Sequence, residues 1–385
     1  MIRWLYRKLC PEGADPAARQ RCGMRAGALG VALNGLLFGG KLAVGLASGA
    51  LSVVADAVNN LSDAASSLVT LVGFRLAGRR ADAGHPFGHG RMEYLAGLTI
   101  SVLILVVGVE LARGAVEKIL SPQLTHMAPL SAVILAVSVA VKLLMGGLYR
   151  ELAVRLESGA LLAAAADARA DAMATAAVLV GLGASQLSGV AVDGWASLLV
   201  AGLVCRAGVL SIRDTLNPLL GQAPDPQMVE EIQRVILGHR EVEGIHDLVI
   251  HDYGPGRRMM SAHAEVSDQA GLVEIHDVMD HIERELRHRF GIEAVLHADP
   301  VQRGNPRLDG LREQVEELAR TIHPGVSIHD LRLLERRGRP VLCFDVVVPY
   351  EVKDSDEQIR RHLEGLLAAA DGSVRPLITV DRPVS

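Results

Sequence analysis

Aromatic residues and cysteine motifs are both scarce in this sequence. Only 3% of the 385 residues are aromatic although 50% are hydrophobic, so the apolar residues do not fit one large soluble core built on aromatic rings. The four cysteines share no CxxC or CxxxH spacing, which indicates neither a disulfide framework nor a zinc–thiolate site. We therefore expect all four to be reduced.

Charged residues are scarce too, but only in part of the chain. Gly and Ala crowd the first 215 residues, whereas charges become dense after Asp225. Small side chains let helices approach closely in lipid, where no hydrophobic drive holds them together. The sequence therefore predicts a membrane domain over residues 25–214 and a soluble tail. The basic segment 1–24 lacks the apolar core of a signal peptide and is expected to be a cytoplasmic lead-in.

Six segments are apolar enough to cross a bilayer, which takes about 20 residues. We expect an α-helical membrane protein with six transmembrane helices at residues 25–47, 51–77, 92–118, 127–149, 156–183 and 190–212. Arginines flank the second and fourth loops and are nearly missing from the others, which places both termini and the tail in the cytoplasm. Richness in Ala, Gly and Arg suggests a bacterial origin and hence the inner membrane.

Two of these segments carry matched pairs of polar residues. Asn59 and Asp63 lie four residues apart, as do Asp167 and Asp171, so each pair shares one helix face. A carboxylate at the bilayer centre costs about 2.5–3.5 kcal/mol, and several in one bundle need a reason. If the faces meet, the four side chains form an oxygen-rich cage for a divalent cation. The alternative is that the carboxylates form helix–helix hydrogen bonds or pair with Arg169. This alternative could account for a single aspartate, but it accounts poorly for two matched pairs.

Other polar residues in the apolar segments leave alternatives open. Asp56 is either an entry ligand or, as we favour, a capping or solvated residue. Lys142 and Arg169 either neutralise the empty site or, as we favour, direct their head groups elsewhere. Glu110 and Arg113 are spaced as a mutual ion pair.

The loop after the second helix, RRADAGHPFGHGRMEYLAG, contains a second candidate site. Asp82, His85 and His89 supply one carboxylate and two imidazoles, a typical transition-metal triad, and Gly88 and Gly90 allow the bend that gathers them. The alternative is that the histidines are merely solvated; we favour metal binding.

The tail contains an internal repeat. GIHDLVIHDYGPGRRMMSAHAEV (244–266) resembles SIHDLRLLERRGRPVLCFDVVV (327–348), and in each copy strand, turn and strand precede a helix and a final strand. This order predicts two small α+β domains of ferredoxin-like type, at residues 225–300 and 307–385.

Histidines distinguish the two copies. The second keeps only His329, and Asp345 stands at the position of His263, whereas the first holds His246, His251, His263, His276 and His297 with Asp299. We expect the first copy to bind metal and the second to be a degenerate structural or dimerisation module. The alternative is that these histidines lie on a polar strand face without a metal.

The segment HPFGHGRMEYLAG, following ADAVNNLSDAASSLVTLVGFRLAGRRAD, resembles the cation diffusion facilitator family, and the resemblance runs from about Ala26 to Pro300. It implies six helices before a cytoplasmic metallochaperone-like domain, and a homodimer that exchanges a divalent metal for protons. It also implies metal ligands at all three sites: Asn59, Asp63, Asp167 and Asp171 in the membrane; Asp82, His85 and His89 in the loop; and His246, His263, His276, His297 and Asp299 in the tail.

The intramembrane set departs from the zinc-transporting members of that family. Those members commonly have Asp or His at the position of Asn59 and His at that of Asp167, and the combination found here is similar to members assigned to manganese. Carboxylate and carbonyl oxygens suit manganese, whereas imidazole suits zinc. We therefore expect Mn²⁺ as the cation, with zinc or iron as the alternative. The second repeat, from about Arg307, lies outside the common family plan.

Export of a divalent cation against an interior-negative potential costs about 4.6 kcal/mol per 100 mV, so it requires a coupled flux, for which inward protons are the expected source. The expected partners are the metal, protons, the bilayer and a second copy of the chain, without nucleic acid. A membrane-bound metal sensor without transport is disfavoured because a sensor needs no site in mid-bilayer. An intramembrane aspartyl hydrolase is disfavoured because each helix carries a pair of ligands and no GxGD-like stretch occurs.

Overall fold

The computed structural model describes residues 10, 16–48, 51–121, 129–188, 193–302, 305–336, 339–370 and 372–382. Within it the chain forms two compact units. The first comprises residues 1–222 with 252–257, and the second comprises residues 223–251 with 258–385. Each unit is described by itself.

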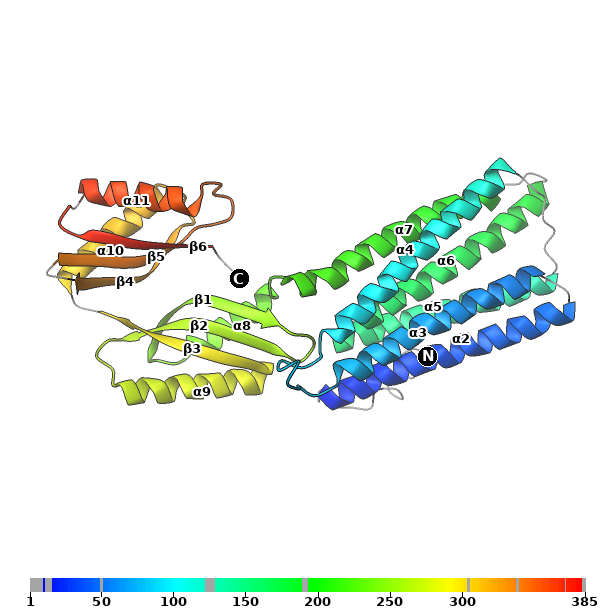
Figure 1. Ribbon diagram of the computed structural model, residues 1–385, viewed down its shortest axis with the longest axis horizontal. Coiled ribbons are helices and arrows are strands. Elements are labelled where there is room, and N and C mark those ends of the chain that lie inside the picture. The colour runs from blue at the N-terminus through cyan, green and yellow to red at the C-terminus, as the bar shows by residue number, and fades with distance from the viewer. Residues whose placement is uncertain are drawn as a thin grey trace. The chain divides into compact units, whose positions relative to one another are not determined.

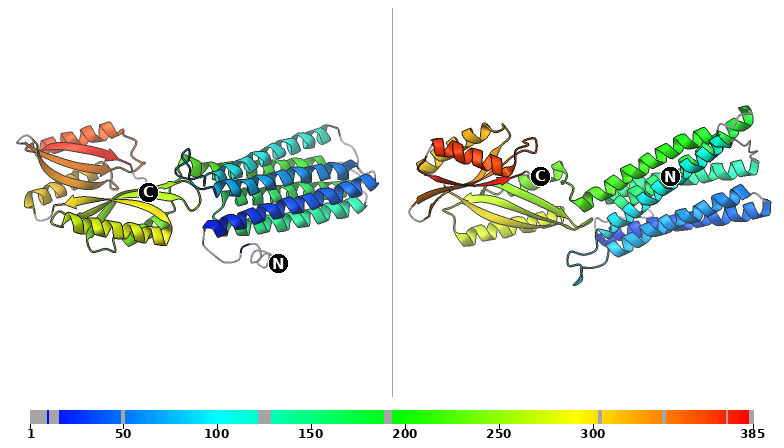
Figure 2. Two further views of the ribbon diagram at one scale, coloured as in Figure 1. Left: turned by 60° about the horizontal axis from the view of Figure 1, so that its bottom comes forward. Right: turned by 45° about the horizontal axis from the view of Figure 1, so that its top comes forward.

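Six long helices build the first unit. They lie side by side in the views of Figures 1 and 2. They are α2 (Pro16–Ser48), α3 (Leu51–Ala77), α4 (Met92–Leu120), α5 (Pro129–Leu156), α6 (Gly159–Ser188) and α7 (Asp193–Leu220). In the described part of the chain, four of them are apolar enough by length and composition to cross a membrane; α3 and α6 carry the predicted polar pairs instead. The expected helical membrane domain with a C-terminal α+β domain is confirmed.

Helix α2 begins at Pro16, earlier than the apolar pattern predicts. The side chain of Arg19 explains the difference because its guanidinium binds the Glu93 carboxylate of α4 at 2.7 and 2.9 Å. Glu93 is fully buried, so this bidentate pair fixes a charged helical turn against the bundle.

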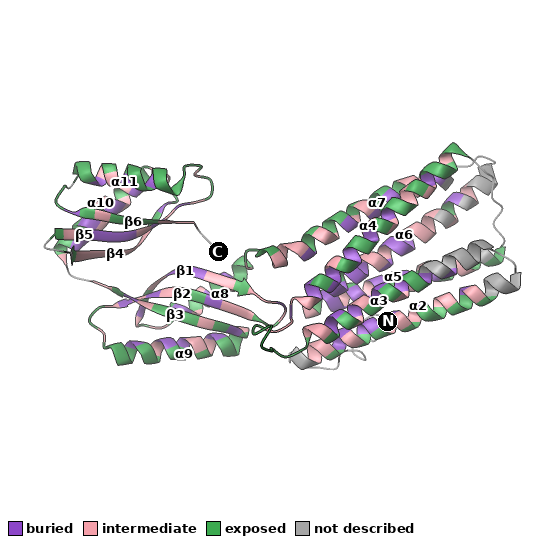
Figure 3. Ribbon diagram, in the orientation of Figure 1, coloured by how far each residue is buried: buried purple, intermediate pink, exposed green. Residues whose placement is uncertain are grey.

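Small residues bring the helix backbones of the bundle together. A Cβ atom on Gly27 of α2 would lie 2.9 Å from the backbone of Leu71 in α3, and one on Gly108 of α4 would lie 3.0 Å from the backbone nitrogen of Cys205 in α7. Large apolar side chains such as Leu36 and Leu199 are exposed. Exposed residues recur along the helices of the bundle (Figure 3). This is the arrangement expected of helices that pack through small residues and face lipid.

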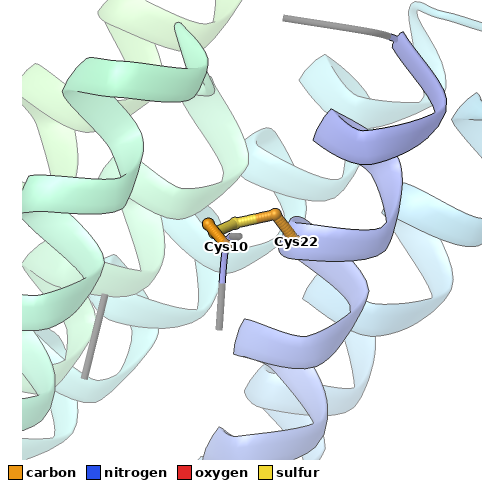
Figure 4. Close-up of a disulfide and its surroundings, with 2 residues drawn as sticks. All are labelled: Cys10 and Cys22. Atoms are coloured by element: carbon orange, nitrogen blue, oxygen red, sulfur yellow. A yellow bond between two sulfur atoms is a disulfide. The ribbon is translucent and has the colours of Figure 1, made fainter. Parts of the chain in front are cut away.

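The expectation that all cysteines are reduced is wrong for one pair. Cys10 and Cys22 form a disulfide, with their Cα atoms 5.2 Å apart (Figure 4). Cys22 is buried on α2. A spacing of 12 residues carries no motif from which the bond could be predicted.

The second unit contains two copies of one αββαβ arrangement. The first copy has α8 (Pro226–Ile236), β1 (Val242–Asp252), β2 (Arg258–Ser267), α9 (Leu272–Phe290) and β3 (Ile292–Val301). The second copy has α10 (Pro306–Arg320), β4 (Ser327–Arg336), β5 (Arg339–Val347), α11 (Asp356–Ala370) and β6 (Arg375–Asp381). The sheets have the orders β1-β2-β3 and β4-β5-β6, and the last two strands of each run parallel.

The same local signals start both copies. Asp225 and Asn305 each cap a helix whose first residue is proline, accepting hydrogen bonds from the backbone nitrogens of Gln227 and Arg307 respectively. In each copy the helices bury their apolar residues against one face of the sheet. The two sheets face one another, with the helices on the outer sides (Figure 1).

Candidate metal centres

The first candidate centre lies inside the helix bundle, where α3, α5 and α6 meet. The ammonium Nζ of Lys142 lies 2.6 Å from Asp63 Oδ2 and 2.8 Å from Asp171 Oδ2. The three side chains are only 4%, 9% and 7% exposed, respectively. The structure therefore brings Asp63 and Asp171 together from two helices, with the ammonium of Lys142 between them.

The other two members of the predicted quartet lie on the same helices. Asp167 stands one turn before Asp171 on α6, close enough to interact electrostatically with Asp63 and Lys142. It also accepts a hydrogen bond from the Ser66 side chain. Asn59 belongs to α3, but its side chain lies outside the described residues, as does that of Asp56.

The expectation that the head group of Lys142 points away from the predicted quartet is wrong. Lys142 supplies the counter-charge of the buried carboxylates, because three charged groups can remain in a low-dielectric bundle only when they compensate one another. Within the described part of the chain, no ion pair joins Arg169 to these aspartates. Glu110 and Arg113 form the expected i, i+3 pair at 3.9 Å.

A further polar layer beside this centre was missed by the sequence analysis. Lys41 Nζ of α2 donates to Ser138 Oγ of α5 at 2.8 Å, and Asn34 donates to Ser67 Oγ at 3.2 Å. Ser67 in turn donates to the backbone oxygen of Asp63 at 3.0 Å. The available signal in the sequence was an asparagine and a lysine, Asn34 and Lys41, within an apolar segment.

The second centre lies in the loop between α3 and α4, and all three predicted residues come together there. Asp82 Oδ1 lies 3.3 Å from His85 Nδ1, and Oδ2 lies 3.5 Å from His89 Nε2. One ligand atom from each residue fits within a 4.8 Å span. A backbone hydrogen bond from His85 is the main cause that lowers the pKa of the exposed Asp82 carboxyl, which favours the charged form that a cation requires.

Two glycines shape this loop for different reasons. Gly88 has φ +83°, a left-handed conformation that glycine adopts without strain. Gly90 permits a close approach, since a Cβ there would lie 2.7 Å from the backbone oxygen of Tyr253. Arg91 holds the same segment, donating to the Asp252 backbone oxygen at 2.7 Å.

The third centre gathers three histidines around one carboxylate in the first repeat. Asp299 Oδ2 lies 2.9 Å from His263 Nδ1 and 3.2 Å from His246 Nε2, and Oδ1 lies 3.2 Å from His297 Nε2. His263 and His297 are paired in the parallel register of β2 and β3. Burial opposes the charged form, but the contacts with His246 and His263 lower the pKa of Asp299. Burial also opposes protonation of His246, yet the carboxylates of Asp299 and Asp247 raise its pKa.

Two histidines of the first repeat do not join this centre. His276 is exposed on α9, which covers the opposite face of the sheet, so the structure does not place this family-implied ligand with the other four in the same chain. His251 is exposed near the end of β1. Sequence reasoning also missed Asp247, whose carboxylate fits within 4.8 Å of ligand atoms from His246 and His263.

Buried carboxylates inside a membrane bundle, an exposed carboxylate–histidine triad and a histidine-rich α+β domain together define a membrane transporter of cations. Residues 28–220 match the cation efflux transmembrane domain, and residues 224–301 match the cation efflux protein cytoplasmic domain. The chain belongs to the cation diffusion facilitator family, whose members are transporters of divalent metal cations and not enzymes.

Three curated relatives illustrate the range of this family. The chain is 30% identical to a cation-efflux pump, FieF, of Pectobacterium carotovorum over 255 residues, covering 66% of this chain and 85% of the relative. It is 28% identical to an uncharacterized transporter of Methanocaldococcus jannaschii over 262 residues, covering 68% and 92%. It is 26% identical to the manganese efflux system protein MneS of Bacillus subtilis over 263 residues, covering 68% and 90%.

Proposed function

We propose that the protein exports Mn²⁺ across a bacterial inner membrane in exchange for protons, with both termini in the cytoplasm and a second copy as partner. The observation that carries the proposal is the buried contact of Asp63 and Asp171 with Lys142. Two carboxylates from different helices already hold a cation at this position. A metal ion that replaces the ammonium meets ligands that are in place.

The ligand set favours manganese. Asp63, Asp167 and Asp171 supply carboxylate oxygens and Asn59 supplies a neutral carbonyl oxygen, a set that suits a hard cation. The resemblance to the manganese efflux protein of Bacillus subtilis supports the same choice. Zinc or iron efflux by the same route is the alternative.

Proton exchange follows from the charge of the empty site. When the metal leaves, Lys142 compensates part of the negative charge, and protons bound by the clustered carboxylates compensate more. The quartet then alternates between access to the cytoplasm and to the outside. The loop set Asp82, His85 and His89 receives cytoplasmic metal, and the cluster around Asp299 acts as a metal sensor.

Flux measurements on the reconstituted protein test this function. In liposomes with an acidic interior, we expect external Mn²⁺ to enter faster than without a pH gradient and the interior to become more alkaline as metal enters. A competition series with zinc, iron, cobalt and cadmium distinguishes manganese from the alternatives. Mn²⁺ entry that ignores the pH gradient contradicts proton exchange, and preferential entry of zinc or iron contradicts manganese as the cation.

The selectivity of the quartet can be shifted by restoring an imidazole. We expect the double variant Asn59→Asp/Asp167→His to transport zinc in preference to Mn²⁺, with the ratio of rates changing by about tenfold or more, which corresponds to 1.4 kcal/mol. The measurement is the zinc-to-manganese flux ratio in liposomes. The exposed His251→Asn replacement serves as a control and should leave the ratio unchanged. An unaltered ratio in the double variant refutes the assignment of the ligands.

A further inference from the structure

A cavity of about 1240 Å³ lies at one end of the sheet of the second repeat. Strands β5 and β6 pair in parallel, with Val341 opposite Arg375, so both begin at this end (Figure 1). The first residues of the two strands line the cavity together with residues 372–374, which lead from α11 into β6. Cavities of about 300–1000 Å³ already enclose most of a drug-sized ligand. The space is therefore large enough for a small organic molecule and not only for an ion.

Two arginines line this cavity at the starts of the two strands. Arg339 is the first residue of β5 and Arg375 is the first residue of β6, and both are exposed. Phe344 of β5 and Ile378 of β6 belong to the apolar core under the helices. Because side chains alternate along a strand, these positions place both arginines on the opposite face of the sheet, which the helices leave uncovered. The two positive charges therefore share one face at one end of the sheet.

The positive charge of this cavity has no fixed counter-charge. Among the residues that the structure describes, no carboxylate lines the cavity, and no ion pair joins Arg339 or Arg375 to one. A third cation approaches the same segment, because Arg307 Nη2 of α10 donates to Ser373 Oγ at 3.4 Å. A concave site lined by charges of one sign concentrates ligands of the opposite sign. The charge of the cavity therefore favours an anion.

The first repeat shows that the fold does not require this charge. When the aspartates near the ends of β3 and β6 are aligned, Arg375 corresponds to Glu293. In the first repeat this position is negative, and its carboxylate lies 3.9 Å from the guanidinium of Arg287. The uncompensated positive charge is therefore particular to the second repeat, which lacks most of the histidines of the first.

We propose that this cavity binds a soluble phosphate-bearing molecule of about nucleotide size, with Arg339 and Arg375 holding the phosphate group. A guanidinium presents a planar fork of donors that matches two phosphate oxygens at once. Val341 and Leu377 line the same cavity, and Leu377 is 51% exposed, so the rest of the ligand meets apolar surface. This site goes beyond metal transport and gives the second repeat a ligand of its own.

Calorimetric titration of the purified full-length protein in detergent, with metals removed by EDTA, tests the site. We expect one ADP to bind per chain, and inorganic phosphate to bind more weakly because it leaves most of the cavity unfilled. Both affinities should fall as the salt concentration rises, because salt screens the exposed charges. The double variant Arg339→Gln/Arg375→Gln should bind ADP about tenfold more weakly or worse, since it loses the charge-assisted hydrogen bonds to phosphate.

A matched control removes the same number of charges from the same repeat. Arg320→Gln/Arg361→Gln replaces exposed arginines of α10 and α11 that already pair with Glu316 and Glu357, so ADP should bind as to the wild type. An equal loss of affinity in this control would show a general effect of charge and overturn the proposal.

A charge reversal separates loss of the ligand from loss of the fold. Arg375→Glu introduces the residue type that the first repeat carries at Glu293, so the unfolding temperature should stay that of the wild type while ADP binding is lost. The proposal is overturned if the wild type binds neither ADP nor inorganic phosphate, or if the double variant binds ADP as tightly as the wild type. Binding only to vesicles of anionic phospholipid, and to neither soluble compound, also overturns it.

Discussion

Mn²⁺ flux in liposomes falls by at least about 100-fold when either Asp63 or Asp171 is replaced by asparagine. Each replacement removes one negative charge from the buried centre while keeping the size of the side chain. The attraction between unit charges about 4 Å apart near a protein surface is about 4 kcal/mol, and every 1.4 kcal/mol is tenfold in binding. The loss therefore affects metal binding and transport together.

The matched control for this experiment is Glu110→Gln on α4. Its carboxylate is 66% exposed and pairs only loosely with Arg113, at 3.9 Å, so the flux should remain that of the wild type. Reduced flux in the control would point to a general effect of charge removal. Wild-type flux in Asp63→Asn or Asp171→Asn would remove these residues from the transport pathway.

Lys142→Met destabilises the metal-free protein more than the metal-loaded protein. Removal of the ammonium leaves the two carboxylates that it contacts without a partner, and breaking a buried pair in this way costs about 3–5 kcal/mol. A bound Mn²⁺ replaces the missing charge, so saturating metal should restore most of the lost stability. The variant should also bind Mn²⁺ more tightly, because no internal cation competes for the carboxylates.

Thermal unfolding in detergent, with and without Mn²⁺, measures this difference. Lys142→Arg keeps a positive charge and should lose much less stability than the methionine variant. Arg113→Met, at a side chain that is 70% exposed, controls for removal of a cation from a membrane helix. If Lys142→Met unfolds at the wild-type temperature and responds to Mn²⁺ as the wild type does, the lysine is not a competitor of the metal.

The bundle and its acidic pairs could be predicted because helix periodicity and the cost of charge in lipid are local properties of the sequence. Spacing alone placed Asp63 and Asp171 on helix faces, and the structure brings these two side chains to one lysine. The position of Lys142 could not be predicted in this way. Whether its ammonium meets the carboxylates depends on how α5 is rotated against α3 and α6, and an isolated apolar helix with one lysine does not specify that rotation.

In the tail, too, local patterns could be predicted from the sequence, whereas contacts between separate elements could not. The repeat and its strand order are visible in the sequence, and the histidines of adjacent strands, His263 and His297, fall in register. His276 does not join the histidine centre because α9 covers the other face of the sheet. The residue type alone does not reveal on which face of the sheet a histidine lies. Asp247 and Asp381 belong to different repeats, and only the packing of one sheet on the other brings them together.

The two repeats of the tail follow one another in a single chain. The first repeat ends with β3 at Val301 and the second begins with α10 at Pro306, so a short connection tethers one to the other. A short tether gives a linked partner an effective concentration of about millimolar, whatever the abundance of the protein. Contact between the two repeats is then an intramolecular equilibrium. Its position does not depend on the concentration of the protein, so the repeats would be paired to the same extent in a cell with few copies of the chain as in a cell with many.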